Sequence, residues 1–152
     1  MEKLKLKANT QLKILQPSDV VFEAIVNPKQ MAEYFISSGD SRMEQGRSVE
    51  WKFDDVGAQM SIDVKTLKLG KQIIYIWPAS GSKTTVQIDL EPADDNSSTV
   101  LSVTEEGWNF DEEGVAKLVE QTQGWVHMFC CMKAYLEYGV HLRKGGSIGK
   151  PD

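Results

Sequence analysis

Several features that signal a specialised class of protein are missing from this sequence of 152 residues. Cysteine occurs only as the adjacent pair Cys130 and Cys131. Two cysteines cannot form a disulfide framework, and a bond between neighbours would strain the joining peptide. No apolar run reaches the ~18 residues of a membrane-spanning helix. Residues 1–7 are rich in lysine, but no apolar stretch follows them. We therefore expect no signal peptide, no membrane partner and a location in the reducing cytoplasm.

An excess of positive charge is missing too. The chain has 17 Lys and Arg against 22 Asp and Glu, a net charge of −5. Proteins that bind the phosphate backbone usually have a basic surface, so we expect no nucleic-acid partner. The hydrophobic share of 41% is typical of a globular domain. We predict a single domain over residues 1–143 and, from the glycines, serine and proline that follow, a disordered tail over residues 144–152.

The first part of the chain predicts a strand and two short helices. Apolar residues alternate with polar ones from Leu4 to Ile14, which indicates a long strand with one buried face. Pro17 and Ser18 then start one short helix, with Ser18 as its cap, and Asn27 and Pro28 start a second, with Asn27 as its cap.

The rest of the chain predicts a sheet and a long helix. From about Met43 to Glu105 the alternation breaks at hairpin-length intervals, which is typical of an antiparallel meander. A change of phase at Thr66 predicts a β-bulge, which would bend the sheet. Residues 111–120 give a weak helical pattern, and after Gly124 the pattern predicts a helix about 30 Å long. The apolar faces of sheet and helix must cover each other.

Five short motifs follow one another in this order of elements: Pro17–Ile25, Asn27–Phe35, Thr104–Gly107, Gly124–Trp125 and Lys133–Glu137. With these motifs the sequence resembles the START-like, or helix-grip, superfamily, also called SRPBCC. Within it, the sequence is most similar to the group related to the C-terminal domain of the activator of Hsp90 ATPase. The resemblance covers about Leu4 to Leu142. It implies an α+β fold in which a curved antiparallel sheet of about six to seven strands surrounds a long C-terminal helix, with two short helices after the first strand.

Some positions depart from the family's pattern. Tyr34 stands where the family often has tryptophan, and Phe129 and Met132 stand where leucines are usual. These exchanges keep hydrophobic bulk, so they change the shape of a cavity rather than the fold. The eukaryotic Hsp90 activator also has a separate N-terminal domain, for which this chain has no room. Activation of a chaperone therefore does not follow from the resemblance.

Members of the superfamily commonly hold hydrophobic small molecules between the sheet and the long helix. The resemblance therefore implies a cavity there, which would bind its ligand mainly by removing apolar area from water. The candidate ligand-binding residues are Tyr34, Phe35, Trp51, Phe53, Met60, Ile62, Trp77, Ile88, Leu101, Val103, Trp108, Trp125, Phe129 and Met132. The alternative is that these side chains simply fill the core.

One carboxylate invites a catalytic interpretation. Glu105 has the same parity as Leu101 and Val103, so its side chain can point inward. A buried carboxylate in an apolar cleft can serve as an acid or a base. We favour the other interpretation, in which the strand has already ended and Glu105 is solvated. We therefore predict no catalytic residue.

A metal site is the other candidate for chemistry. His127 is separated from Cys130 and Cys131 by three and four residues, spacings that allow metal ligation on a helix. A zinc site needs three or four ligands, however, and the second histidine, His141, lies about 20 Å further along. We therefore predict no metal site and no cofactor.

The expected function is the binding of a small hydrophobic ligand by a protein that is not an enzyme. One alternative is a protein-interaction module related to activators of Hsp90 ATPase, with a chaperone as its partner. The other is an enzyme of the cyclase or hydrolase type that uses the cavity. We expect a monomer, or a weak homodimer formed through the exposed first strand.

Overall fold

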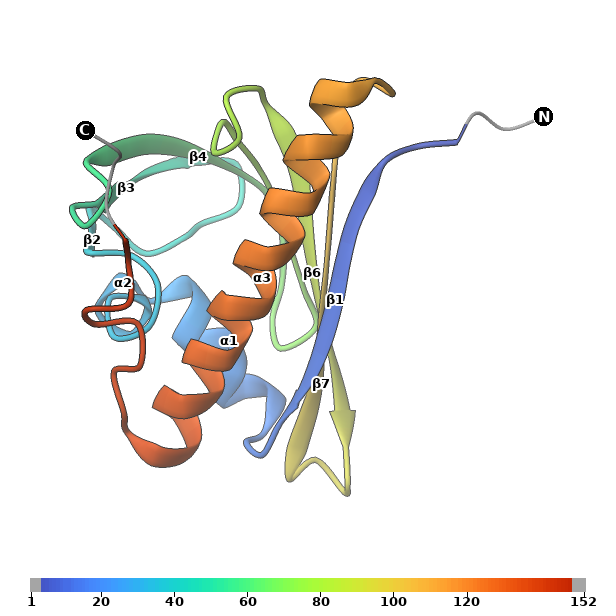
Figure 1. Ribbon diagram of the computed structural model, residues 1–152. Helices are drawn as coiled ribbons and strands as arrows, with labels where there is room; N and C mark the ends of the chain where they lie inside the picture. Colours follow the sequence, from blue (N-terminus) through green and yellow to red (C-terminus); the bar gives the residue numbers. More distant parts are fainter. Residues whose placement is uncertain (1–3, 149–152) are drawn as a thin grey trace.

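The computed structural model describes residues 4–148, in which one antiparallel sheet is crossed by a long helix (Figure 1). The strands are β1 Lys7–Ile14, β2 Ser38–Gly39, β3 Ser48–Phe53, β4 Ala58–Lys68, β5 Gln72–Trp77, β6 Thr84–Ala93 and β7 Ser98–Glu106. The helices are α1 Ser18–Val26, α2 Pro28–Met31 and α3 Glu112–Tyr138. The strand order is β1-β7-β6-β5-β4-β3-β2, so the first strand joins the end of a meander. This architecture confirms the predicted helix-grip fold.

The sheet bends at the predicted β-bulge. In the pairing of β4 with β5, Val64 lies opposite Tyr75 and Thr66 lies opposite Ile74, which leaves Lys65 as an extra residue. An extra residue on one strand bends that strand and increases its twist. Figure 1 shows β3 and β4 curving away from the plane of β6 and β7. The curvature leaves room for aromatic side chains between this part of the sheet and α3.

Helix α3 is a single helix of 27 residues and is longer than the stretch predicted after Gly124. The Asp111 side chain caps it by accepting a hydrogen bond from the Gly114 N–H at 2.8 Å. The weak pattern over residues 111–120 is therefore the first part of the same helix. Gly139 ends the helix with φ 66°, a left-handed conformation that glycine adopts without steric cost.

The two short helices begin differently. Ser18 was expected to cap α1, but it is already helical; the preceding Pro17 contributes its carbonyl, which accepts from the Val20 N–H at 3.1 Å. The prediction for α2 is confirmed, because Asn27 Oδ1 accepts from the Lys29 N–H at 3.0 Å. Both helices lie on the same side of the sheet as α3 (Figure 1).

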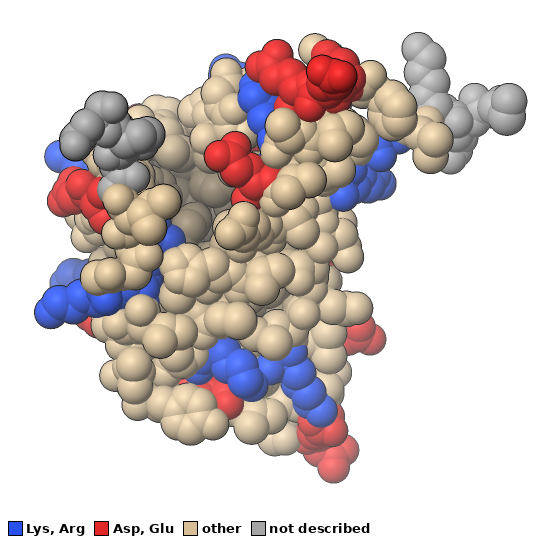
Figure 2. Space-filling view, in the orientation of Figure 1, with Lys and Arg blue, Asp and Glu red and all other residues tan. Residues whose placement is uncertain are grey.

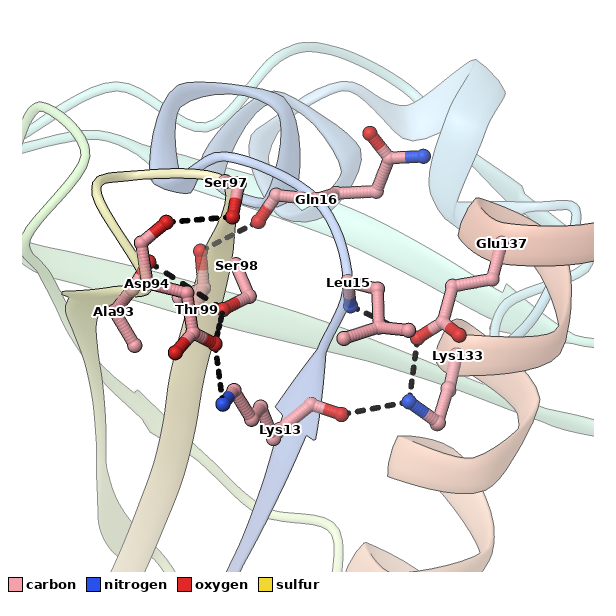
Figure 3. Close-up of polar contacts among 10 residues, drawn as sticks. All are labelled: Lys13, Leu15, Gln16, Ala93, Asp94, Ser97, Ser98, Thr99, Lys133 and Glu137. Carbon is pink, nitrogen blue, oxygen red and sulfur yellow. Dashed lines mark hydrogen bonds and ion pairs between the residues drawn. The ribbon is translucent and has the colours of Figure 1, made fainter.

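The C-terminal half of α3 is fastened to the end of β1 (Figure 3). Lys133 Nζ donates to the Lys13 carbonyl at 2.8 Å and pairs with Glu137 Oε2 at 2.5 Å. The same Glu137 oxygen accepts from the Leu15 N–H at 2.9 Å. We call Lys13, Leu15, Lys133 and Glu137 the α3–β1 clamp. These contacts hold the C-terminal half of α3 in a fixed position against the end of β1.

Two further predictions concern the C-terminal tail and membrane-spanning helices. Residues 149–152 of the predicted tail lie outside the described residues, as do residues 1–3. Within residues 4–148, no helix is long and apolar enough to cross a membrane.

Candidate functional site

A buried carboxylate lies where β7 meets the middle of α3. Glu105 has no solvent-exposed surface, and uncharged donors from three other elements surround it. Trp77 Nε1 donates to Oε2 at 3.0 Å and Trp125 Nε1 donates to Oε1 at 2.8 Å. Thr84 Oγ1 donates to Oε2 at 2.5 Å, and Gln121 Nε2 lies 3.0 Å from Oε1 and 3.2 Å from Oε2. These hydrogen bonds offset the cost of placing a carboxylate away from water.

The interpretation of Glu105 as a solvated residue was therefore wrong. Strand β7 continues to Glu106, and Glu105 pairs with Ala8 on one side and Val86 on the other. Because β7 still has a neighbouring strand on both sides at Glu105, alternation keeps the Glu105 side chain on the face that carries Leu101 and Val103. To exchange a proton with a substrate, Glu105 would first have to lose one of these hydrogen bonds. Its contacts therefore favour a structural role, in which the carboxylate accepts hydrogen bonds that hold the two tryptophan rings in place.

The two tryptophans held by Glu105 form the floor of an aromatic cluster. The Trp77 and Trp125 ring centroids are 5.5 Å apart, with 34° between the ring planes. Phe35 lies 6.3 Å from Trp77 and 6.4 Å from Trp125, and its ring meets that of Phe53 edge-on at 5.1 Å. The cluster thus brings together aromatic side chains from α3, β3, β5 and the segment after α2. Offset and edge-on contacts of this kind stabilise aromatic pairs.

The Glu105 charge also affects a neighbouring phenol. Tyr75 is buried beside Trp77, with ring centroids 5.5 Å apart. Burial, and to a smaller degree the negative charge of Glu105, hold the pKa of Tyr75 well above its ordinary range.

A pocket of about 260 Å³ opens beside this cluster, between α3 and the part of the sheet formed by β3, β4 and β5. The space-filling view shows a hollow on this face of the molecule (Figure 2). Its lining residues are Phe35, Phe53, Val56, Ala58, Met60, Trp77, Ala79, Gln121, Gly124, Trp125, His127 and Arg143. Apolar side chains make up most of this wall, with a few polar groups, which is the usual composition of a small-molecule site.

The structure distributes the sequence-predicted ligand residues over three places. Those that line the pocket are Phe35, Phe53, Met60, Trp77 and Trp125. Those buried in the core, away from the pocket wall, are Tyr34, Trp51, Ile62, Ile88, Leu101, Val103, Phe129 and Met132. Trp108 is also buried, but it lies at the edge of the core, beside two other hollows near Gly107, where its Nε1 donates to Ser80 Oγ at 3.0 Å.

Sequence reasoning missed the polar and the small residues of the wall. Gly124 was noted as part of the Gly124–Trp125 motif and as the start of a helical pattern, but not as a pocket residue; a side chain added there would meet no heavy atom within 4 Å. Gln121 and His127 lie three residues before and after it on the same helix. His127 was considered as a metal ligand, and Gln121 was not singled out. The spacing of three between these residues is the one signal that could have grouped them.

Arg143 was missed because it follows the helix. Its guanidinium carbon lies 5.6 Å from the Phe35 ring centroid and 5.9 Å from that of Phe53. Its Nη2 pairs with Asp55 Oδ2 at 3.2 Å, which connects the C-terminal segment to the turn between β3 and β4. Arginine over aromatic rings is a favourable cation–π arrangement. Arg143 therefore forms the rim of the pocket.

The structure does not group the residues considered for metal binding. Cys130 is exposed and Cys131 is fully buried, so the two thiols point to different environments. Burial raises the pKa of the Cys131 thiol. Within residues 4–148 no three His, Cys, Asp or Glu side chains are placed to hold a metal ion.

Comparisons with known proteins agree with the fold. The family model described as "Activator of Hsp90 ATPase homolog 1-like protein" matches residues 16–137. No curated protein matches the chain in sequence.

Solved structures are similar over nearly the whole chain. Protein SSP2350 from Staphylococcus saprophyticus has 31% sequence identity and a TM-score of 0.78, over 90% of this chain and 96% of that one. The Aha1 dimer from Colwellia psychrerythraea has 17% identity and a TM-score of 0.74, over 88% and 97%. DynU16, from the dynemicin biosynthetic locus, has 21% identity and a TM-score of 0.78, over 90% of this chain and 49% of that one. The last two show likeness of fold alone.

Proposed function

This chain belongs to the family of activator of Hsp90 ATPase homolog 1-like proteins, and we propose that it binds a small hydrophobic molecule in the pocket between α3 and strands β3 to β5. The observation that carries the proposal is the aromatic wall formed by Phe35, Phe53, Trp77 and Trp125 around about 260 Å³ of space. Water in such a space lacks polar partners on most sides, so an apolar ligand gains free energy by replacing it.

The buried carboxylate supports this role. Glu105, which does not line the pocket, accepts from the indole N–H groups of Trp77 and Trp125, so the polar edges of these rings are satisfied without a ligand. A rigid wall loses little conformational entropy on binding.

The pocket offers a direct test through Gly124. Gly124→Leu adds a side chain where nothing lies within 4 Å of a Cβ, and leucine is a strong helix former, so we expect the variant to fold and partly fill the pocket. Gln123→Leu is the matched control, because Gln123 is exposed on the same helix and does not line the pocket.

The measurement is a titration with phenylnaphthylamine, a neutral apolar fluorophore that accepts excitation energy from tryptophan. We expect saturable binding to the protein, weaker by about tenfold or more in Gly124→Leu and unchanged in Gln123→Leu, since lost burial of a few apolar atoms is worth about 1–3 kcal/mol. The absence of saturable binding, or equal affinity in all three proteins, would overturn the proposal.

The family description favours a second candidate, interaction with a chaperone. The family description names an activator of Hsp90 ATPase, and one structural neighbour is described as an Aha1 dimer. This candidate predicts that the protein raises the ATPase rate of Hsp90 from the same cell. Equal rates with and without the protein would remove it, and they would leave the ligand proposal untouched.

A further inference from the structure

The pocket has one permanently charged residue in its wall, within the part of the chain that the structure describes. Arg143 is the only Lys, Arg, Asp or Glu among the lining residues. Its side chain is 19% exposed, so its charge is partly shielded from water. Charge interactions gain strength where water is partly excluded. A ligand in this pocket therefore meets a positive group at the rim.

The negative charge of Glu105 lies at the opposite end of the aromatic cluster from Arg143. Glu105 contacts the edges of Trp77 and Trp125, which form the floor, whereas Arg143 contacts the faces of Phe35 and Phe53 at the rim. The donors on Glu105 already satisfy both of its oxygens. The site is thus apolar at the floor and positive at the rim.

A second hollow lies on the other side of Arg143. It measures about 370 Å³ and shares Arg143 with the aromatic pocket. Its other lining residues include Asp55, His141 and Lys144, so it is more polar and carries further basic groups. Arg143 is therefore the partition between an apolar pocket and a polar one.

We infer that the ligand is an aromatic acid, whose ring system lies against Trp77 and Trp125 and whose carboxylate pairs with Arg143. This inference rests on the proposed function and gives that ligand its chemical class. A planar guanidinium has five N–H donors and binds carboxylates with two parallel hydrogen bonds. The pair with Asp55 uses one terminal nitrogen at 3.2 Å, so the group can serve a second acceptor.

The Asp55 carboxylate has two effects on such a ligand. It orients the guanidinium over the pocket rim, and its negative charge opposes a second carboxylate at the same place. Removing that charge while keeping the shape of the side chain therefore separates the two effects. Asp55→Asn is expected to tighten the binding of an acid and to leave the binding of a neutral analogue unchanged.

The test compares naphthoate with naphthamide, its neutral isostere, by isothermal titration calorimetry at neutral pH. We expect naphthoate to bind about tenfold more tightly than naphthamide, the ratio typical of one charge-assisted hydrogen bond. Arg143→Met should reduce this preference to about twofold or less. The control is Arg47→Met, because Arg47 pairs with Glu44 and does not line the pocket.

The outcomes separate the inference from the proposed function. If both compounds bind equally and Gly124→Leu weakens both, the pocket binds apolar ligands and the inference is overturned. If neither compound binds to a protein that does bind phenylnaphthylamine, the inference is also overturned. If none of the three binds, the proposed function fails with it. Tighter binding of naphthoate to Asp55→Asn supports the inference through a gain of affinity, which an unfolded variant cannot mimic.

Discussion

Trp125 Nε1 donates to Glu105 Oε1 at 2.8 Å, and this hydrogen bond joins the middle of α3 to the end of β7 in a place that water does not reach. Trp77 reaches the same carboxylate from β5. With Thr84 of β6, which also donates to it, the carboxylate connects the helix to three strands of the sheet. The floor of the pocket therefore depends on a residue that is not part of its wall.

The first prediction concerns this carboxylate. Glu105→Gln keeps the size of the side chain but turns an N–H₂ group toward donors, so buried N–H groups lose their acceptor. We expect the free energy of unfolding to fall by about 2–4 kcal/mol, measured by urea denaturation followed by tryptophan fluorescence.

The neighbouring residue provides the control for this prediction. The Glu106 side chain is 38% exposed, and its Oε2 is buried, accepts no hydrogen bond from residues 4–148 and lies 3.8 Å from Lys7 Nζ. Glu106→Gln should change the free energy of unfolding by no more than about 0.5 kcal/mol. Equal losses in the two variants would contradict the role given to Glu105.

The second prediction concerns the α3–β1 clamp. Lys133→Met leaves the Glu137 carboxylate, whose side chain is 6% exposed, without its cation. We expect a loss of about 1–2 kcal/mol in the free energy of unfolding. Lys13→Met is the matched control, because Lys13 joins the clamp through its backbone carbonyl and its Nζ pairs with the exposed Asp94. A larger loss in the control than in Lys133→Met would show that the clamp is unimportant.

The third prediction concerns alkaline pH. Burial raises the pKa of both Tyr34 and Tyr75 well above the ordinary value. The unfolded chain releases these protons near pH 10, whereas the folded chain keeps them, so the unfolded state binds fewer protons above about pH 10 and stability falls as pH rises. Denaturation curves between about pH 8 and pH 11 measure this fall.

Tyr75→Phe tests the origin of the alkaline fall. Tyr34 donates to the Ala24 carbonyl at 2.8 Å, so replacing Tyr34 would remove a buried hydrogen bond as well as the titrating hydroxyl. Tyr75 is therefore the better site for this test. The variant should show a shallower decline with pH. Tyr138→Phe should keep the full decline, because Tyr138 is 74% exposed. An identical slope in the Tyr75→Phe protein would refute the explanation.

The fourth prediction concerns the thiols. Cys130 is exposed, whereas Cys131 is fully buried and burial raises the pKa of its thiol. The thiolate is the reactive form, so a maleimide should label one cysteine of the folded protein quickly and the second only on unfolding. Mass spectrometry counts the labels. Cys130→Ser should abolish the fast label and Cys131→Ser should keep it. Rapid double labelling of the native protein would contradict the burial of Cys131.

The fold could be predicted because its signals are local. The alternation up to Ile14, the change of phase at Thr66 and the turn residues around Asn27 each depend on a few neighbouring positions. Period two places side chains on one face of a strand whatever the rest of the chain does.

The site was harder to predict because its contacts are distant in sequence. Glu105 is kept inside by Trp77 and Trp125, donors that lie 28 and 20 residues away. The parity of Glu105 shows where its side chain points but not which donors surround it, so the sequence alone favoured the solvated interpretation. Arg143 follows the helix and reaches the rim only because Gly139 turns the chain back. The aromatic residues of the wall were expected, since hydrophobic bulk on inward positions is visible in the sequence.

The closeness of Trp77 and Trp125 has an optical consequence. Two indoles whose centroids are 5.5 Å apart and whose planes are tilted by 34° couple their electronic transitions, and a tilted pair in a chiral frame produces a pair of circular-dichroism bands of opposite sign. The far-ultraviolet spectrum of the folded protein should therefore contain a tryptophan signal in addition to those of helix and sheet. Trp51, whose ring centroid lies 6.2 Å from that of Trp77, couples to the same pair. The signal therefore reports the arrangement of the three tryptophans without any added label.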